Sequence, residues 1–95
     1  MKQLVLNKKI ARNPKVAFTH MDNDLVLMGP DDDQFYSVNP TGTKIWSLLE
    51  FNSYSLHEIC HSLLKEYDVA ESTCRIDALA FIETMVAKNI LLLSE

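Results

Sequence analysis

Glycine is scarce in this chain of 95 residues, where only Gly29 and Gly42 are present. A loop that holds phosphate groups with its backbone amides needs several closely spaced glycines, so the sequence excludes a nucleotide-binding loop of that kind. Long apolar runs are also missing, since no stretch approaches the roughly 20 residues of a membrane-spanning helix. The apolar run at residues 4–6 is too short for a secretory signal. We therefore expect a cytoplasmic protein without a membrane partner.

Basic residues are outnumbered as well. Nine Lys and Arg stand against 13 Asp and Glu, which gives a formal net charge of -4. Binding to nucleic acid depends largely on Lys and Arg, so this balance argues against a nucleic-acid partner. The only two cysteines are Cys60 and Cys74, and each stands among apolar residues. Because the reducing cytoplasm disfavours disulfides, we interpret both as buried thiols.

Three segments in the first half of the chain have the composition of β-strands. Residues 16–21 and 25–28 flank a turn-compatible Asp-Asn-Asp sequence and predict a hairpin. After a loop at residues 29–33, the aromatic segment 34–38 predicts a third strand. We interpret residues 1–14 as a loosely held N-terminal arm and residues 15–95 as one domain.

Helix-start signals follow in the second half. Asn39 is a good N-cap, and Pro40 suits the first helical position because its missing N–H would be unpaired there. Ser55 with Glu58 three residues later forms a capping box for a second helix. A third helix and a closing strand at residues 90–93 complete the pattern. The predicted fold is α+β and winged helix-turn-helix-like, with a three-stranded antiparallel sheet followed by three helices.

The third predicted helix, from about residue 71 to residue 88, has two adjacent apolar stripes. Successive residues lie 100° apart on a helix, which separates the stripes. One consists of Leu79, Ile82, Val86 and the stem of Arg75, and the other of Cys74, Ala78, Phe81 and Met85. Packing on a single core needs only one stripe, which we take to be the first. The second stripe is either buried on another side or left for a partner.

Residues 57–61, His-Glu-Ile-Cys-His, match the H-E-x-x-H pattern of zinc peptidases. A catalytic zinc needs a third protein ligand, and the one remaining histidine, His20, lies on a predicted strand. Glu58 already serves the capping box. Cys60 lies within the apolar stripe of its helix, where a thiol has a raised pKa and is a poor nucleophile. We expect no metal, no cofactor and no catalytic residue.

Strands followed by helices also fit a small winged-helix DNA-binding regulator. A recognition helix presents basic and amide side chains to the groove. The third helix presents Phe81 and Met85 instead, and its two basic residues are outnumbered by acidic ones. The regulator is kept as an alternative function.

Several short segments follow one another in a specific order. They are residues 11–14 (ARNP), 25–28 (LVLM), 34–42 (QFYSVNPTG), 45–49 (IWSLL), 55–59 (SLHEI), 63–69 (LLKEYDV), 77–82 (DALAFI) and 89–92 (NILL). Their succession resembles the PqqD family. Asn89 stands where the family has Gly after the third helix, and Asn tolerates left-handed geometry. The QFYSVNPTG segment is more similar to stand-alone lasso-peptide recognition proteins than to PqqD of pyrroloquinoline quinone synthesis.

The resemblance implies a non-catalytic recognition domain for ribosomally made, post-translationally modified peptides. Family members bind the leader segment of a precursor peptide and present it to a modifying enzyme such as a peptidase, a cyclase or a radical enzyme. The leader adds as a strand to the third strand, in a groove walled by the third helix. The exposed edge of that strand would also allow a homodimer.

This mode of binding implies a set of site residues. The backbone that would hydrogen-bond the leader belongs to Gln34, Phe35, Tyr36, Ser37 and Val38. The side chains that would receive its apolar residues are those of Cys74, Ala78, Phe81 and Met85, with Phe35 or Tyr36. Arg75 either pairs with a leader carboxylate or is a surface charge.

Overall fold

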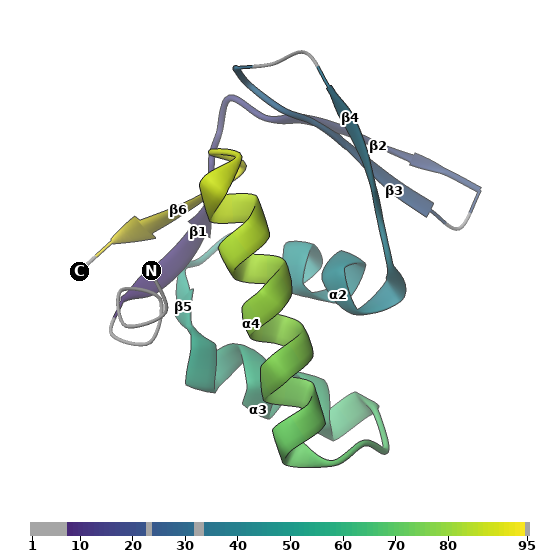
Figure 1. The fold of residues 1–95 in the computed structure, drawn as a ribbon, viewed down its shortest axis with the longest axis vertical. Coiled ribbons are helices and arrows are strands. Elements are labelled where there is room, and N and C mark those ends of the chain that lie inside the picture. Colours follow the sequence, from purple (N-terminus) through teal and green to yellow (C-terminus); the bar gives the residue numbers. More distant parts are fainter. Residues whose placement is uncertain (1–7, 23, 32–33, 95) are drawn as a thin grey trace.

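The computed structural model describes residues 8–22, 24–31 and 34–94, which form two small antiparallel sheets and three helices (Figure 1). The first sheet has the order β2-β3-β4, with β2 at Ala17–Met21, β3 at Asp24–Met28 and β4 at Phe35–Val38. The second has the order β5-β1-β6, with β1 at Lys9–Arg12, β5 at Tyr54–Ser55 and β6 at Leu91–Ser94. The helices are α2 at Pro40–Leu48, α3 at Leu56–Glu66 and α4 at Glu71–Ala87. The α+β prediction is confirmed.

The predicted three-stranded meander is the first sheet. β2 and β3 pair from Ala17↔Met28 to Met21↔Asp24. Asp22 begins the turn between them with a φ of 59°, a left-handed conformation that Asp accepts more readily than most residues. Asn23 and residues 32–33, which belong to the two predicted turns, lie outside the described residues.

Both predicted helix starts are confirmed. The side chain of Asn39 accepts a hydrogen bond of 2.7 Å from the Gly42 N–H, and Pro40 is the first residue of α2. At α3, the Ser55 N–H donates to Glu58 Oε1 over 2.9 Å, and the Glu58 N–H donates to Ser55 Oγ over 3.2 Å. These reciprocal bonds satisfy backbone donors that a helix N-terminus otherwise leaves unpaired.

The interpretation of residues 1–14 as an arm is wrong for residues 9–12, which form the central strand β1 of the second sheet. Ile10 is fully buried there, opposite Tyr54 on one side and Leu93 on the other. Its partner strands come from distant parts of the sequence, so no local sequence pattern predicts β1. The closing strand is confirmed as β6. Residues 1–7 of the expected arm lie outside the described residues.

Arg12 fixes the end of β1 against α2. Its Nε donates a hydrogen bond of 2.9 Å to the Trp46 carbonyl oxygen, and its guanidinium carbon lies 4.3 Å from the Trp46 ring centroid. The ring of Phe18 lies on the same guanidinium, with its centroid 5.2 Å away. Partial burial lowers the pKa of Arg12, and the charge of Glu50 opposes that effect. The N-terminal strand is therefore tied to both the first sheet and the helices.

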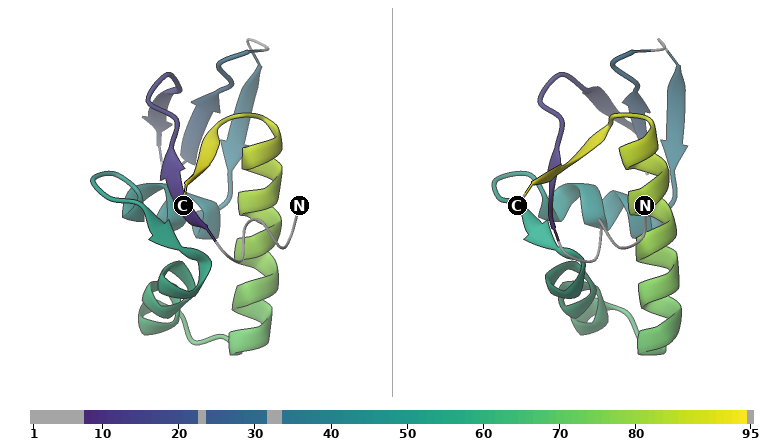
Figure 2. Two further views of the ribbon diagram at one scale, coloured as in Figure 1. Left: turned by 90° about the vertical axis from the view of Figure 1, so that its left-hand side faces the viewer. Right: turned by 60° about the vertical axis from the view of Figure 1, so that its left-hand side comes forward.

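α4 is the longest helix and connects the parts of the domain. It contacts α2, α3 and β6, and it runs from the α3 end of the molecule to the second sheet (Figures 1 and 2). After its last turn Asn89 has a φ of 62°, as expected for a residue in place of a helix-ending Gly. Among the described helices, none is long and apolar enough to cross a membrane.

Candidate functional site

β4 has one open edge. It pairs with β3 on one side, and no other described strand pairs with it on the other. The Gly29 N–H donates to the Gln34 carbonyl oxygen over 2.9 Å, so Gln34 hydrogen-bonds across this ladder. Hydrogen-bonded and non-hydrogen-bonded pairs alternate along an antiparallel ladder. Tyr36 and Val38 therefore hydrogen-bond to β3 as well. Phe35 and Ser37, which alternate with them, point their backbone N–H and C=O groups to the open edge.

The two aromatic side chains of β4 lie on opposite faces of the sheet, as alternation along a strand requires. Phe35 is 66% exposed and lines a shallow apolar pocket on the outer face together with Val26 and Met28. Tyr36 is half-buried on the inner face, where the Nζ of Lys88, the residue directly after α4, lies 4.5 Å from its ring centroid. Tyr36 is therefore the aromatic residue on the side of α4.

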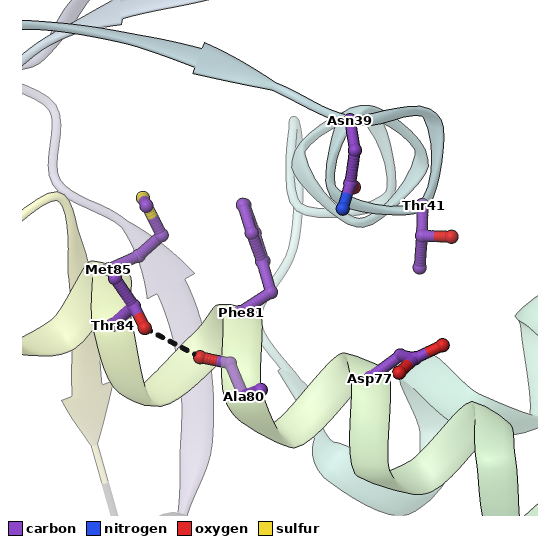
Figure 3. A pocket seen from close by; sticks show the side chains of 7 residues that line it. All are labelled: Asn39, Thr41, Asp77, Ala80, Phe81, Thr84 and Met85. Carbon is purple, nitrogen blue, oxygen red and sulfur yellow. Dashed lines mark hydrogen bonds between the residues drawn. The ribbon is translucent and has the colours of Figure 1, made fainter.

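A pocket of about 380 Å³ lies between the end of β4, the first turn of α2 and the middle of α4 (Figure 3). Its lining combines apolar and polar side chains, namely Asn39, Thr41, Asp77, Ala80, Phe81, Thr84 and Met85. Asn39 uses its Oδ1 to cap α2, which leaves its side-chain NH₂ as a donor. The Thr84 hydroxyl donates to the Ala80 carbonyl oxygen over 2.9 Å. The open backbone edge of β4 thus lies next to a pocket that has both apolar and polar side chains.

Gly42 lies close behind Phe81, one of the residues that line this pocket. A Cβ atom at Gly42 would lie 2.6 Å from Phe81 Cε1 and 2.5 Å from Val38 Cγ1, both much closer than van der Waals contact. The missing side chain lets the Phe81 ring pack on the first turn of α2. Phe81 therefore both lines the pocket and packs against the core.

The family model described as Coenzyme PQQ synthesis protein D (PqqD) matches residues 24–91, which is most of the chain. The chain belongs to the PqqD family. The match spans β3, β4 and all three helices, and so includes every residue that lines the pocket. The resemblance seen in the sequence is confirmed. No curated protein sequence matches the chain.

Solved structures share this PqqD-family fold. The structure of TbiB1 in complex with the TbiA(beta) leader peptide is 27% identical, with a TM-score of 0.74, 85% of this chain covered and 93% of that chain. Lasso peptide synthetase B1 complexed with the leader peptide is 19% identical, with a TM-score of 0.73 and coverages of 87% and 96%. The PqqD truncation of Methylobacterium extorquens PqqCD, a stand-alone recognition element for ribosomally synthesized and modified peptides, is 16% identical, with a TM-score of 0.72 and coverages of 88% and 88%.

The assignment of the two stripes on α4 needs correction in this PqqD-family chain. Cys74 and Ala78, expected in the groove, are 5% and 0% exposed and belong to the core, whereas Leu79 is only half-buried. The reason is that α4 packs on α2 and α3 together, so both stripes are largely covered. Of the expected groove side chains, Phe81 and Met85 line the pocket, and Met85 does so although it is only 7% exposed.

Arg75 does not face β4. At 100° per residue it lies about 160° around α4 from Asp77, on the far side of the helix from the pocket. Sequence reasoning also missed Asp77, Ala80 and Thr84, which share the pocket face with Phe81. Small and polar side chains leave no apolar periodicity, so only their common helical face could have indicated them.

The two cysteines are free and buried, as predicted. Cys74 on α4 lies close enough to Cys60 on α3 to affect the ionisation of the Cys60 thiol. Burial, and then the neighbouring Cys74, raise the pKa of the Cys60 thiol to about 11. A thiol held neutral in this way is a poor nucleophile.

The His-Glu-Ile-Cys-His segment lies on α3, away from the open edge. His57 and His61 are exposed and line a shallow pocket with Tyr54 and Glu58. Hydrogen bonds from the Ser55 backbone and from Lys9 lower the pKa of Glu58, so this carboxylate already has partners. Within the described ranges, no three His, Cys, Asp or Glu side chains converge as metal ligands would. The absence of a metal stays a prediction.

Proposed function

We propose that this chain recognises the leader segment of a ribosomally synthesised precursor peptide and presents the precursor to a modifying enzyme. One observation carries the proposal: the open edge of β4 directs the N–H and C=O groups of Phe35 and Ser37 outward beside a pocket on α4. An edge of this kind binds an extended peptide by adding it as a strand. Two structures with the same fold are complexes with a leader peptide, which supports a leader as the ligand.

The geometry of such a complex follows from the pleat. Leader residues opposite Tyr36 and Val38 would point to the inner face, because directly opposed side chains in a sheet lie on the same face. Those residues reach α4, where Phe81 and Met85 supply apolar surface. Leader residues opposite Phe35 would instead extend the outer face of the sheet. Backbone hydrogen bonds thus provide affinity, and the inner-face side chains provide specificity.

The chain itself is proposed to be non-catalytic. The PqqD truncation with the same fold is a recognition element, and the described residues offer neither an activated nucleophile nor a group of metal ligands. Chemistry on the precursor would belong to a separate peptidase, cyclase or radical enzyme. A DNA-binding role gains no support from the family or from the similar structures.

Hydrogen exchange of single amides, followed by NMR, tests the proposal. The probes are synthetic peptides that correspond to the N-terminal halves of short reading frames beside the gene. A leader that adds to β4 should protect the Phe35 and Ser37 amides, while the Tyr36 and Val38 amides, already bonded to β3, should change much less. Saturable binding that leaves both edge amides unprotected would overturn strand addition at β4.

Self-association through the same edge is the necessary control. A second copy of the chain would compete with the leader for the same backbone groups. Protection that rises with protein concentration in the absence of peptide would indicate a homodimer. Protection that follows peptide concentration at fixed protein concentration indicates leader binding.

A further inference from the structure

We propose that Asp77 makes the groove select a leader strand with a cationic residue, Lys or Arg, at the position that crosses Phe81. This inference rests on the proposed function and deepens it, since it assigns a side-chain class to the pocket on α4. The pocket is not purely apolar, and its single carboxylate decides which side chain fits.

Asp77 is exposed at the mouth of the pocket and lies across from Thr41 (Figure 3). It makes no hydrogen bond or ion pair with another residue in the described part of the chain, whereas Asn39 and Thr84 each have one. One turn further along α4, Phe81 provides an apolar surface. An unpaired carboxylate therefore stands directly beyond an apolar wall.

Lys and Arg side chains fit an apolar surface that is followed by a carboxylate. Both have long apolar stems that pack on apolar side chains while the charged end remains at the solvent boundary. A stem that crosses Phe81 would bring its cationic end to Asp77 and the Thr41 hydroxyl, where a charge-assisted hydrogen bond forms. A leader with an aliphatic residue there would cover the carboxylate without pairing it, which carries a desolvation penalty. A Glu or Asp would be repelled, so the pocket also discriminates against the opposite charge.

The orientation of α4 fixes the end of the groove at which the cation binds. Phe81 lies against Gly42 just beyond the end of β4, and Lys88 lies over Tyr36 near its start. The Asn89 side chain reaches Asp31 in the loop before β4 over 3.2 Å, so α4 runs antiparallel to this strand. Lys88 repels a cation at the start of β4. The Lys or Arg therefore belongs on the inner face of the leader, at the end next to Asn39.

The experiment uses the full chain and a display library of random peptides about 12 residues long, so that no precursor has to be known. The wild-type chain is compared with Asp77→Asn and with Asp68→Asn, a control that also loses one exposed carboxylate but lies outside the pocket. Wild type and the control should enrich peptides with Lys or Arg at one aligned position. Asp77→Asn should lose that enrichment, and a selected peptide should lose about three- to tenfold in affinity for it.

The outcomes separate this inference from the function on which it rests. Peptides that protect the Phe35 and Ser37 amides without any cationic preference, equally in wild type and Asp77→Asn, would overturn the role of Asp77 and leave leader binding intact. If no peptide is enriched at all, both proposals fail. Asp77→Lys supplies the converse test, because it should shift the enriched residue to Asp or Glu. Asp77 is exposed, and equal melting temperatures would show that each variant is folded.

Discussion

Phe81 lies so close to Gly42 that a Cβ atom at Gly42 would come within 2.6 Å of Phe81 Cε1. The contact joins the middle of α4 to the first turn of α2, next to the end of β4. It places a large ring where the open edge of the sheet ends, and so gives the groove its apolar wall. A residue 39 positions earlier in the sequence thus determines whether Phe81 can occupy this place.

Gly42→Ala should displace the Phe81 ring and destabilise the domain. Overpacking of a closely fitted site costs about 1–3 kcal/mol in the free energy of unfolding, which denaturant titration measures. Ser47→Ala, an exposed position on the same helix, is the control. In the double variant Gly42→Ala/Phe81→Ala, the loss should be smaller than the sum of the single losses. Additive losses would show that the two positions do not interact.

Phe81→Ala and Ile82→Ala, neighbours on α4, should have different effects. Ile82 is fully buried, so its truncation leaves a cavity and should cost about 2–5 kcal/mol of stability. Phe81 is half-buried, and its truncation should cost less stability but weaken leader binding by about 1–3 kcal/mol. Denaturant titration and peptide titration give the two quantities. If Phe81→Ala unfolds the domain as strongly as Ile82→Ala while affinity in the folded fraction is unchanged, the ring is purely structural.

Proline substitutions can distinguish the role of the open edge of β4 in leader binding from the role of its paired edge in stability. Ser37→Pro removes an N–H that faces the open edge, so it should abolish leader binding while the domain stays folded. Tyr36→Pro removes an N–H that bonds to β3, so it should lower the melting temperature instead. Circular dichroism with heating and a fluorescence titration of labelled leader measure both effects. Full leader affinity in Ser37→Pro would contradict strand addition at this edge.

The buried thiol of Cys60 should make stability depend on pH in the alkaline range. Its pKa is about 11 in the folded chain, raised from the ordinary value of 9.0, so the unfolded chain releases this proton first. The contribution of Cys60 to stability is complete below pH 9 and should be lost as the pH rises towards 11. Cys60→Ala should show a shallower fall over this window in urea titrations. Equal slopes for both proteins would show that Cys60 titrates normally.

The histidine pair on α3 should not bind zinc as a structural or catalytic metal. A metal site needs a third ligand, and Glu58 is held by Ser55 and Lys9. Purified protein should contain no stoichiometric zinc, and a chelator should leave the melting temperature unchanged. One zinc per chain that is lost in His61→Ala would overturn this interpretation of the segment.

Local chemistry in the sequence determined the starts and the types of most elements. Asn39 and Ser55 cap α2 and α3 through side chains that bond to amides only three residues away. Such short-range bonds depend on residue types at fixed spacing, which a sequence displays directly. The strand-like composition of residues 16–21, 25–28 and 34–38 and the turn-compatible Asp-Asn-Asp sequence predicted the meander in the same way. The family, too, was visible from the order of these local segments.

Tertiary structure alone decided the second sheet and the faces of α4. Ile10 is buried because residues 54–55 and 91–94 pair with β1 on its two sides. These segments are far from β1 in the sequence, and a periodic pattern of apolar residues does not reveal such long-range pairing. Cys74 and Ala78 went to the core and Asp77 to the pocket because α2 and α3 both pack on α4. The physical reason is that apolar periodicity shows which side chains avoid water but not which neighbour covers them. That choice depends on close approach between distant segments, such as the one that Gly42 permits to Phe81.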